Sequence, residues 1–584
     1  MSRDQRTGRK IKKENKKSGS IAKIIPALVA IVLIIAVVWF SFGKQIIDKY
    51  SYSNERYDMT VYFENTSEHD VAIIMQDKFM GERAYLYDGT YYVDMDFVNT
   101  YLNNRFYFDS YENLLIYTLP LDMITVETGS DVAKGLNDTE NLGYKATREE
   151  DGKLLVALDY VLKFSNYEYK AFTDPARIQM YTEWNEITTA TVKKDTQVRH
   201  KGGVKEEILK DVKAGDKVTV IEQMDTWSKV KTDDAIIGFV ENKFLNEGYV
   251  ELPVPVSDYV EPEYTNLCRD HKINMGWHSI AGVAGNDTFN QAVSQTKGLN
   301  VISPTWFKLT DNVGNYDSYA TQDYVDKAHK MGMEVWPTLD NIEHGSDVDM
   351  KEVLKRTSQR QDLISRLTND ILAMGIDGIN IDIEMLPVEA GRDFSEFLRE
   401  LSISCRQNGI VLSVDDYVPL GNTDYYDRKT QGEVCDYVVI MGYDEHYATS
   451  EETGSVASIG FVEKGIKKTL EEVPAQKIIN GIPFYTRVWT TEGADITSAA
   501  MDMRNADEWI DVHGISLEWD DETCQYYGER TEGNKLYQVW KEDVESIKVK
   551  LSVMQANNIA GVAEWCLGYE TPEVWDAIEE YLNQ

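Results

Sequence analysis

Residues 377 to 384 read DGINIDIE, and their alternating polar and apolar side chains could carry acid–base chemistry. In a strand, Asn380, Asp382 and Glu384 would point to one face and three isoleucines to the other. Carboxyl groups beside a hydrophobic face are costly to bury unless they are paired or used. Parallel barrels keep their catalytic groups at the ends of strands that follow helices. The segment therefore predicts an active site.

The elements that must hold this segment form a repeating pattern of strand-like and helical text over residues 267–584. Just before DGINIDIE, Leu363, Leu367 and Ile371 recur every four residues and Gly375 follows, which predicts a helix and its end. Eight such strand–helix units predict an α/β fold, a (β/α)8 TIM barrel with DGINIDIE on its fourth strand and an insertion at about 486–535. The strand-like runs begin at residues 272, 299, 333, 378, 410, 437, 477 and 559.

Three segments with other patterns precede the barrel. Residues 55–185 contain an internal repeat that starts at two Asp-Gly pairs, 63 residues apart, and each copy predicts strand, short helix, strand, strand in an α+β domain. Residues 190–247 hold short strand-like runs separated by Gly and Asp, which predict a small β-barrel. Residues 251–266 contain three prolines and predict a stiff linker.

An apolar segment near the N-terminus predicts a membrane helix. Residues 24–43 carry no charged side chain and would span roughly 30 Å as a helix, about the hydrocarbon core of a bilayer. A cleaved signal peptide is the alternative, but it needs a shorter apolar region and a small-residue cleavage site. The basic tail of residues 1–23 has nine Lys and Arg, which predicts a cytoplasmic N-terminus and an extracellular remainder of the chain.

Composition excludes some partners. The formal net charge is −38 and the pI is about 4.6, which argues against nucleic acid as a partner. The five cysteines are scattered, odd in number and never in a CxxC pair, so the sequence predicts no disulfide framework and no zinc site. No metal and no other cofactor are expected.

The barrel segment resembles glycoside hydrolase family 18, the chitinase-like barrels, in which a D-x-x-D-x-D-x-E run ends the fourth strand. The match covers about 267–584 and includes later strands: MGYDEHY, GIPFYTRVW and GVAEW are similar to the family's sixth, seventh and eighth strands. Several segments look closest to the branch of spore-cortex and cell-wall N-acetylglucosaminidases. The residues that these later strands bring to the resemblance are Met441, Tyr443, Asp444, Pro483, Tyr485, Arg487, Trp489 and Trp565.

The resemblance implies a catalytic mechanism. A glycosidic oxygen is a poor leaving group, and Glu384 is the expected acid and base. Asp382 and Tyr443 are expected to hold the substrate's 2-acetamido group, whose oxygen attacks to form an oxazolinium ion with retention. Trp565 is expected to stack under the sugar. The further substrate-binding candidates are Asn380, Met441, Asp444, Tyr485, Arg487, Trp277 and Asp377, of which Asp377 is expected more to brace the loop into the strand than to touch sugar.

One position departs from the family pattern. Many members have Asp where this chain has Asn380, and the substitution would leave Asp382 without a partner with which to share a proton. An altered pH–rate profile is the expected consequence.

The two preceding segments also resemble known modules. Residues 190–247 are similar to bacterial SH3-like domains, whose usual role is to hold cell-wall peptides; a spacer is the alternative. The 55–185 repeat resembles the small module at the N-terminus of copper amine oxidases, without a histidine cluster that would imply copper chemistry. A scaffold or wall-adhering role is expected for it.

Together these features predict a membrane-anchored, extracellular, retaining glycosidase that cleaves β-linked N-acetylglucosamine-containing glycans, with peptidoglycan preferred. A chitinase or an endo-N-acetylglucosaminidase acting on other glycans is the first alternative, because the same catalytic residues serve all three. A scaffold that binds wall glycan without turnover is the second.

Overall fold

The computed structural model describes residues 21–255, 257, 259–343 and 348–584. The chain divides into two compact units. One contains Met1–Asp94 and Ser165–Tyr259, and the other contains Met95–Phe164 and Val260–Gln584. The predicted 55–185 segment is thus shared between the units, and its boundaries as one domain stay a prediction.

The first unit begins with a long apolar helix. Helix α1 (Ile21–Val38) continues through a π-helical turn (Trp39–Gly43) into α2 (Lys44–Tyr50). Its residues Ile25–Tyr50 are long and apolar enough to cross a membrane. Residues 1–20 of the predicted basic tail lie outside the described residues.

Two sheets complete the first unit. One contains β1 (Asp70–Met75), β2 (Lys78–Tyr87), β3 (Thr90–Asp94), β11 (Glu168–Phe172) and β12 (Arg177–Tyr181), ordered β11-β12-β1-β2-β3. The other is the predicted small β domain, with strand order β15-β14-β18-β17-β16-β13-β19. Its strands are β13 (Ile187–Thr191), β14 (Thr196–Arg199), β15 (Ile208–Val212), β16 (Lys217–Gln223), β17 (Trp227–Thr232), β18 (Ile237–Glu241) and β19 (Tyr249–Glu251).

The second unit contains the predicted barrel. Its strands are β20 (Ile273–His278), β21 (Val301–Pro304), the split pair β24 (Glu334–Val335) and β25 (Thr338–Asp340), β26 (Gly378–Asp382), β27 (Val411–Tyr417), β28 (Tyr437–Met441), β29 (Ile478–Pro483) and β35 (Gly561–Trp565). Each pairs in parallel with the next, and β35 pairs with β20, so the barrel closes. The short strands β22 (Phe307–Leu309) and β23 (Tyr316–Ser318) extend it beside β25. DGINIDIE lies on the fourth strand, as predicted.

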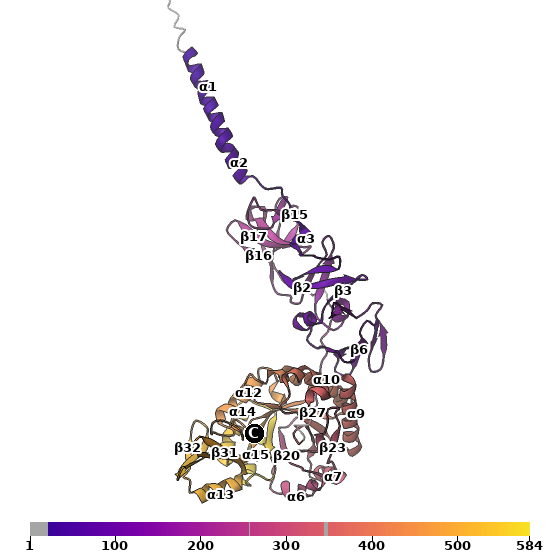
Figure 1. Cartoon of the computed structure of the whole chain (residues 1–584), viewed down its shortest axis with the longest axis vertical. Helices are drawn as coiled ribbons and strands as arrows, with labels where there is room; N and C mark the ends of the chain where they lie inside the picture. The colour runs from indigo at the N-terminus through magenta and orange to yellow at the C-terminus, as the bar shows by residue number, and fades with distance from the viewer. Residues whose placement is uncertain (1–20, 256, 258, 344–347) are drawn as a thin grey trace, which may run out of the picture. The chain divides into compact units, whose positions relative to one another are not determined.

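Helices surround these strands (Figure 1). They are α6 (Phe289–Ala292), α7 (Gln322–Lys330), α8 (Met350–Leu354), α9 (Thr357–Met374), α10 (Gly391–Asn408), α11 (Arg428–Val434), α12 (Ile459–Thr469), α14 (Val544–Ala556) and α15 (Glu573–Leu582). Helix α9 ends at Gly375, whose φ of 67° is the left-handed cap that glycine adopts at low cost. The chain then turns directly into β26.

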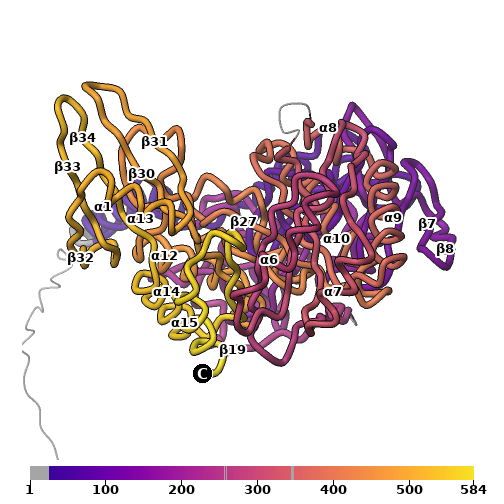
Figure 2. Tube along the Cα trace, turned by 90° about the horizontal axis from the view of Figure 1, so that it is seen from below, coloured from indigo at the N-terminus to yellow at the C-terminus, as the bar shows by residue number. Residues whose placement is uncertain are grey.

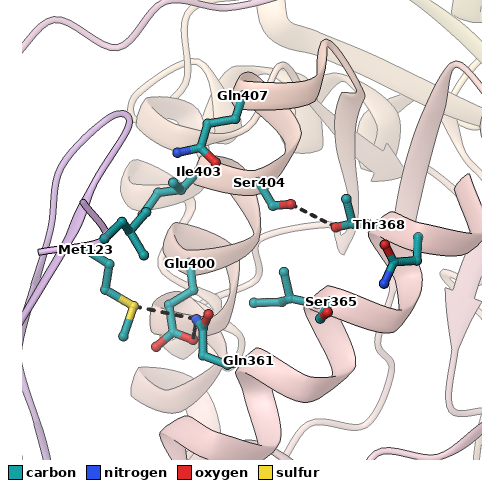
Figure 3. Close-up of a pocket in the computed structure, with 11 residues that line it drawn as sticks. Met123, Gln361, Ser365, Thr368, Glu400, Ile403, Ser404 and Gln407 are labelled. Atoms are coloured by element: carbon teal, nitrogen blue, oxygen red, sulfur yellow. Dashed lines mark hydrogen bonds between the residues drawn. The ribbon is translucent and has the colours of Figure 1, made fainter. Parts of the chain in front are cut away.

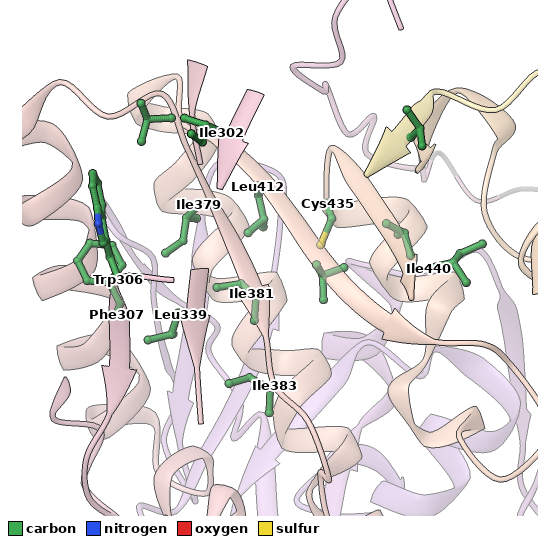
Figure 4. Packing of buried hydrophobic residues seen from close by; sticks show 14 of the residues in the cluster. Ile302, Trp306, Phe307, Leu339, Ile379, Ile381, Ile383, Leu412, Cys435 and Ile440 are labelled. Atoms are coloured by element: carbon green, nitrogen blue, oxygen red, sulfur yellow. The ribbon is translucent and has the colours of Figure 1, made fainter. Parts of the chain in front are cut away.

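The apolar face of β26 packs outward, against the surrounding helices. Ile379, Ile381 and Ile383 belong to the large core cluster that also contains Leu339 and Leu412 of the neighbouring strands (Figure 4). A separate cluster fills the inside of the barrel and includes Met275, Trp336, Val439 and Ile479. The isoleucines therefore fix which face of β26 turns inward, because the side-chain period of a strand is two.

The predicted insertion lies between β29 and β35. It forms the sheet β31-β30-β34-β33-β32 and the helix α13 (Met503–His513) (Figure 2). The strands are β30 (Tyr485–Glu492), β31 (Asp495–Asp502), β32 (Glu518–Asp520), β33 (Gln525–Glu532) and β34 (Lys535–Lys541). The inserted sheet therefore runs slightly past both ends of the expected 486–535 range.

Residues 95–164 form a lobe of the second unit. Its sheet follows the order β4 (Phe106–Asp109), β5 (Leu114–Thr118), β6 (Met123–Glu127), β7 (Val132–Lys134) and β8 (Thr139–Asn141). The lobe also has α4 (Met95–Phe97), β9 (Thr147–Glu150), β10 (Lys153–Ala157) and α5 (Leu158–Leu162). The repeat of residues 55–185 follows the predicted order of strand, short helix, strand, strand in both copies. The first copy is β3, α4, β4 and β5, and the second is β10, α5, β11 and β12.

The lobe caps the first turn of α9. Asp109 Oδ2 accepts hydrogen bonds from the backbone N and Oγ1 of Thr357, both at 2.7 Å. Glu112 Oε2 accepts from the backbone N of Ser358 at 3.0 Å. The first N–H groups of a helix lack intrahelical partners, and negative charge is favourable there. Acids of the lobe thus accept hydrogen bonds from the first N–H groups of a helix that begins about 250 residues further along the chain.

A buried ion pair joins α9 to α10 beside the lobe. Arg360 Nη2 lies 2.7 Å from Glu400 Oε1, and neither side chain has exposed surface. Arg360 Nη1 also donates to Tyr107 Oη at 3.3 Å. Met123 of the lobe and Ile403 of α10 share a hydrophobic cluster with Tyr107. The lobe therefore holds the two helices that precede and follow β26.

A cavity of about 240 Å³ remains between α9, α10 and the lobe (Figure 3). On its wall, Gln361 Nε2 donates to Glu400 Oε2 at 2.8 Å and lies 3.5 Å from Met123 Sδ. Thr368 and Ser404 share a hydrogen bond of 2.8 Å across the two helices.

Candidate active site

Glu384 lies just beyond the carboxyl end of β26, and its main chain and side chain are both fixed. Asn341 Oδ1 accepts from the backbone N of Glu384 at 3.0 Å, and Asn341 Nδ2 donates to its carbonyl oxygen at 2.9 Å. Tyr417 Oη donates to Glu384 Oε2 at 2.8 Å. Neighbours on the third and fifth strands therefore set where this carboxyl group points.

The surroundings of Glu384 favour its protonated form. Burial raises the pKa of this carboxyl, and the charges of Asp444 and Asp340 raise it further, while the Tyr417 hydrogen bond opposes the rise. A carboxylic acid with a raised pKa keeps its proton to higher pH and can release it to a leaving oxygen. Glu384 is thus suited to act as a general acid.

Asp382 lies on the inward face of β26 with its carboxyl deeply buried. Burial raises its pKa well above the ordinary value, and Asp415, Glu384 and Asp340 raise it further, while Lys308 lowers it. Asp382 Oδ1 is buried without a hydrogen-bond partner among the described residues. Such an oxygen either can accept a further hydrogen bond or carries the proton of the acid.

Asn380 is expected to leave Asp382 without a partner with which to share a proton, yet an acid of the fifth strand, Asp415, acts on Asp382. Asn380 Nδ2 donates to Asp415 Oδ2 at 2.6 Å, and Ser413 Oγ donates to Asn380 Oδ1 at 2.6 Å. Asp415 is the largest charged contributor to the raised pKa of Asp382. An acid on the fifth strand is therefore present beside the amide on the fourth.

A lysine partly offsets this acidic cluster. Lys308 Nζ donates to Asp340 Oδ2 at 2.7 Å, and both side chains are almost fully buried. Burial nevertheless raises the pKa of Asp340, against the attraction of Lys308. The Lys308 ammonium group is therefore already paired with Asp340, the acid of the third strand.

Aromatic side chains at neighbouring strand ends surround the acids. The ring of Trp277 makes edge contacts with Trp565 and Tyr443, with centroids 5.9 and 6.4 Å apart. Burial, together with Asp415 and Asp382, raises the pKa of Tyr443 well above its ordinary value, so its hydroxyl stays a donor. A Cβ at Gly481 would lie 2.9 Å from the Tyr443 ring, so only glycine leaves room for this ring position.

Among the other predicted residues, Tyr485, Asp444 and Met441 lie next to side chains of this site, whereas Arg487 is engaged in the insertion. Tyr485 Oη donates to Asp444 Oδ1 at 2.5 Å, which fixes both residues next to Tyr443. Met441 ends the sixth strand beside Tyr417. Arg487 lies on β30 of the insertion, where its Nη1 donates to Ser498 Oγ of β31 at 3.1 Å.

Asp377 is not brought to the cluster. It precedes β26, at the opposite end of the strand from Glu384, and its Oδ2 accepts from the backbone N of Val335 at 2.9 Å. His329 Nε2 lies 2.8 Å from the same oxygen. Asp377 therefore braces the entry to the strand, the role the sequence favoured over sugar contact.

Residues of the candidate site that were not predicted from the sequence include Asp340, Asn341, Asp415 and Tyr417. Two of them carried a usable signal. In the run 411–417, Ser413, Asp415 and Tyr417 alternate with apolar or outward positions, as in DGINIDIE. Asp416, between them, faces Arg428 instead, at 3.2 Å.

Comparisons with known proteins agree with this geometry. The family model described as glycosyl hydrolases family 18 matches residues 279–570, and the bacterial SH3 domain model matches residues 194–246. "Putative sporulation-specific glycosylase YdhD" of Bacillus subtilis (strain 168) is 30% identical over 251 residues, 41% of this chain and 59% of that protein. The cortical fragment-lytic enzyme of the same organism is 26% identical over 241 residues, 40% of this chain and 56% of that protein.

The chain thus spans a little over half the length of these two curated relatives. Among solved structures, the Bacillus cereus spore cortex-lytic enzyme SleL aligns with a TM-score of 0.48 and 19% identity, over 53% of this chain and 74% of that one.

Proposed function

Because the chain belongs to the glycosyl hydrolases of family 18, we propose that it is a retaining glycosidase of N-acetylglucosamine-containing glycans. The observation that carries the proposal is Glu384 at the end of the fourth barrel strand. Its carboxyl is held by Tyr417 and its pKa is raised by burial. Asp382 and Tyr443 lie close enough to interact electrostatically, on the inward side.

The arrangement supports substrate-assisted catalysis. Glu384 donates its proton to the glycosidic oxygen as the substrate's acetamido oxygen attacks the anomeric carbon. Tyr443, a hydroxyl donor, is suited to hold that acetamido oxygen, and Asp382 to accept the acetamido N–H. The resulting oxazolinium ion is opened by water, from which the Glu384 carboxylate takes a proton. Trp565 supplies an aromatic floor for the sugar, and the predicted sugar contact of Trp277 is wrong, because Trp277 is buried behind Trp565 with 1% of its surface exposed.

Peptidoglycan is the glycan we favour. The named relatives include cortical fragment-lytic enzymes, and a bacterial SH3 domain match precedes the barrel. An SH3-like domain that holds wall peptides would place the barrel beside its substrate. The Ile25–Tyr50 helix would anchor the chain in the cell membrane, with the basic tail in the cytoplasm and the barrel outside.

A chitin-type glycan is the second candidate, because the di-N-acetylchitobiase of Homo sapiens is 23% identical over 329 residues, 80% of that protein. Products separate the two. The full chain, purified in detergent micelles, is incubated with peptidoglycan and separately with chitin oligomers, and mass spectrometry identifies the new reducing ends. Fragments that end in N-acetylglucosamine from peptidoglycan alone are expected. Binding without products from either glycan would instead indicate a wall-binding scaffold.

Tyr417→Phe is expected to move the alkaline limb of the kcat/KM profile upward by about one pH unit. The Tyr417 hydroxyl stabilises the Glu384 carboxylate, so its removal raises the pKa of Glu384 further. The acid form, which donates the proton, then persists to higher pH. Initial rates on a soluble oligomer across the pH range test this, and an alkaline limb that stays in place or moves down would contradict it.

A further inference from the structure

The inward face of the fourth and fifth strands holds two carboxyl groups side by side. The parallel register pairs Asn380 with Ser413 and Ile381 with Val414. One step further along this register, Asp382 lies beside Asp415. Neighbouring strands are about 4.8 Å apart, so side chains at paired positions on one face lie in contact range.

Asn380 fixes how Asp415 is presented. Its Oδ1 accepts from Ser413 Oγ, so its Nδ2 must point the other way, to Asp415 Oδ2 at 2.6 Å. That leaves Asp415 Oδ1 buried and without a hydrogen-bond partner among the described residues, and Asp382 Oδ1 is in the same state. A buried polar atom that is left without a hydrogen-bond partner destabilises the fold. One proton shared between the two carboxyl groups would remove both deficits.

The surrounding charges favour keeping that proton. The negative charges of Asp415, Glu384 and Asp340 act on Asp382, and so does the cation Lys308. Lys308 is already bound to Asp340. The charge of Glu384 acts on Asp415, and so does that of Asp416, which lies on the other face of the strand with Arg428 as its partner. Closely placed carboxyl groups in a buried site cannot all ionise, and such a pair titrates in two coupled steps.

We propose that Asp415 is a positioning residue of the reaction. It shares one proton with Asp382 and so takes the role of the acidic side chain that position 380 lacks. The inference rests on the proposed function. When the acetamido N–H approaches, the proton leaves an oxygen of Asp382 and joins an oxygen of Asp415, and Asp382 accepts the N–H. Only O–H bonds change, and the pair keeps one proton and one negative charge throughout.

The test moves the acidic neighbour of Asp382 from the fifth strand to the fourth. It uses the full chain, purified in detergent micelles. Asp415→Asn is expected to lower kcat about 10²-fold through misplacement of the acetamido group. With its acidic neighbour gone, Asp382 titrates alone and at lower pH, so one ionisation moves or disappears from the pH–rate profile. The double variant Asn380→Asp/Asp415→Asn returns the acid to the pair and is expected to restore most of kcat and the second ionisation.

Two results would overturn the inference: an Asp415→Asn variant with the wild-type rate and profile, or a double variant no better than the single one at an unchanged melting temperature. A second measurement does not depend on turnover. Infrared spectra of protein labelled with ¹³C-aspartate should show a protonated carboxyl band that titrates in wild type and shifts in Asp415→Asn. If the wild type cleaves no glycan, the proposed function fails, and this titration still decides whether the proton is shared.

Discussion

Glu384→Gln is expected to lower kcat on N-acetylglucosamine oligomers by about 10²–10⁴-fold, the usual contribution of a general acid. The amide keeps the shape of the side chain and can still hydrogen bond to Tyr417, whose Oη lies 2.8 Å from Glu384 Oε2. It has no proton to give to the leaving oxygen. Steady-state rates on a soluble oligomer measure the loss, and calorimetry with the same oligomer measures binding.

Glu389→Gln is the matched control. This acid is exposed, five residues further along the same segment, and is expected to leave kcat within twofold of wild type. Oligomer binding by Glu384→Gln should persist, because the aromatic side chains around Trp565 are untouched. Turnover at the wild-type rate by Glu384→Gln would show that another carboxyl group protonates the leaving oxygen.

Glu400→Gln is expected to destabilise the α9–α10 region by about 3–5 kcal/mol, the cost of leaving one partner of a buried ion pair alone. Arg360 has no exposed surface, and although burial disfavours its charge, Glu400 holds its pKa above the ordinary value. A guanidinium stays protonated in proteins even without its partner, so the Arg360 cation would remain with its main counter-ion gone. Hydrogen exchange of the α9 and α10 amides measures the local opening free energy without assuming that the two units unfold together.

Two variants show whether the effect comes from the buried charge. Glu463→Gln removes the acid of an exposed pair with Lys467 on α12 and is expected to cost no more than about 1 kcal/mol. Arg360→Met/Glu400→Leu removes both buried charges and should recover much of the loss. Unchanged exchange in Glu400→Gln would mean that the lobe contacts alone hold the two helices.

Much of the barrel could be predicted from the sequence, because each strand carries its own local pattern. The isoleucines of DGINIDIE face the core and its polar residues face inward, as the period of two requires. Gly375 ends α9 where the periodic leucines stop. These features depend on residues that are close together in the chain.

Contacts between segments that lie far apart in the chain could not be predicted from the sequence. Asp415 meets Asn380 only through the register of two strands that a whole helix separates. The capping of α9 by Asp109 joins residues 248 positions apart, and no local pattern signals it. Asp377 shows the opposite case: its type fitted the signature, but its place before the strand puts it at the other end.

The lobe of residues 95–164 also sets an order for folding. It is synthesised before α9, the helix that it caps, and the 248 residues from Asp109 to Thr357 take roughly 12–50 s at about 5–20 residues per second. Until Ile403 is synthesised, which is later still, Tyr107, Ile116 and Met123 lack the contact that completes their cluster. Such exposed apolar surface binds chaperones and invites aggregation. A chain cut to start at residue 260 would carry the converse liability, with Arg360 and Ile403 uncovered on a barrel that lacks its lobe.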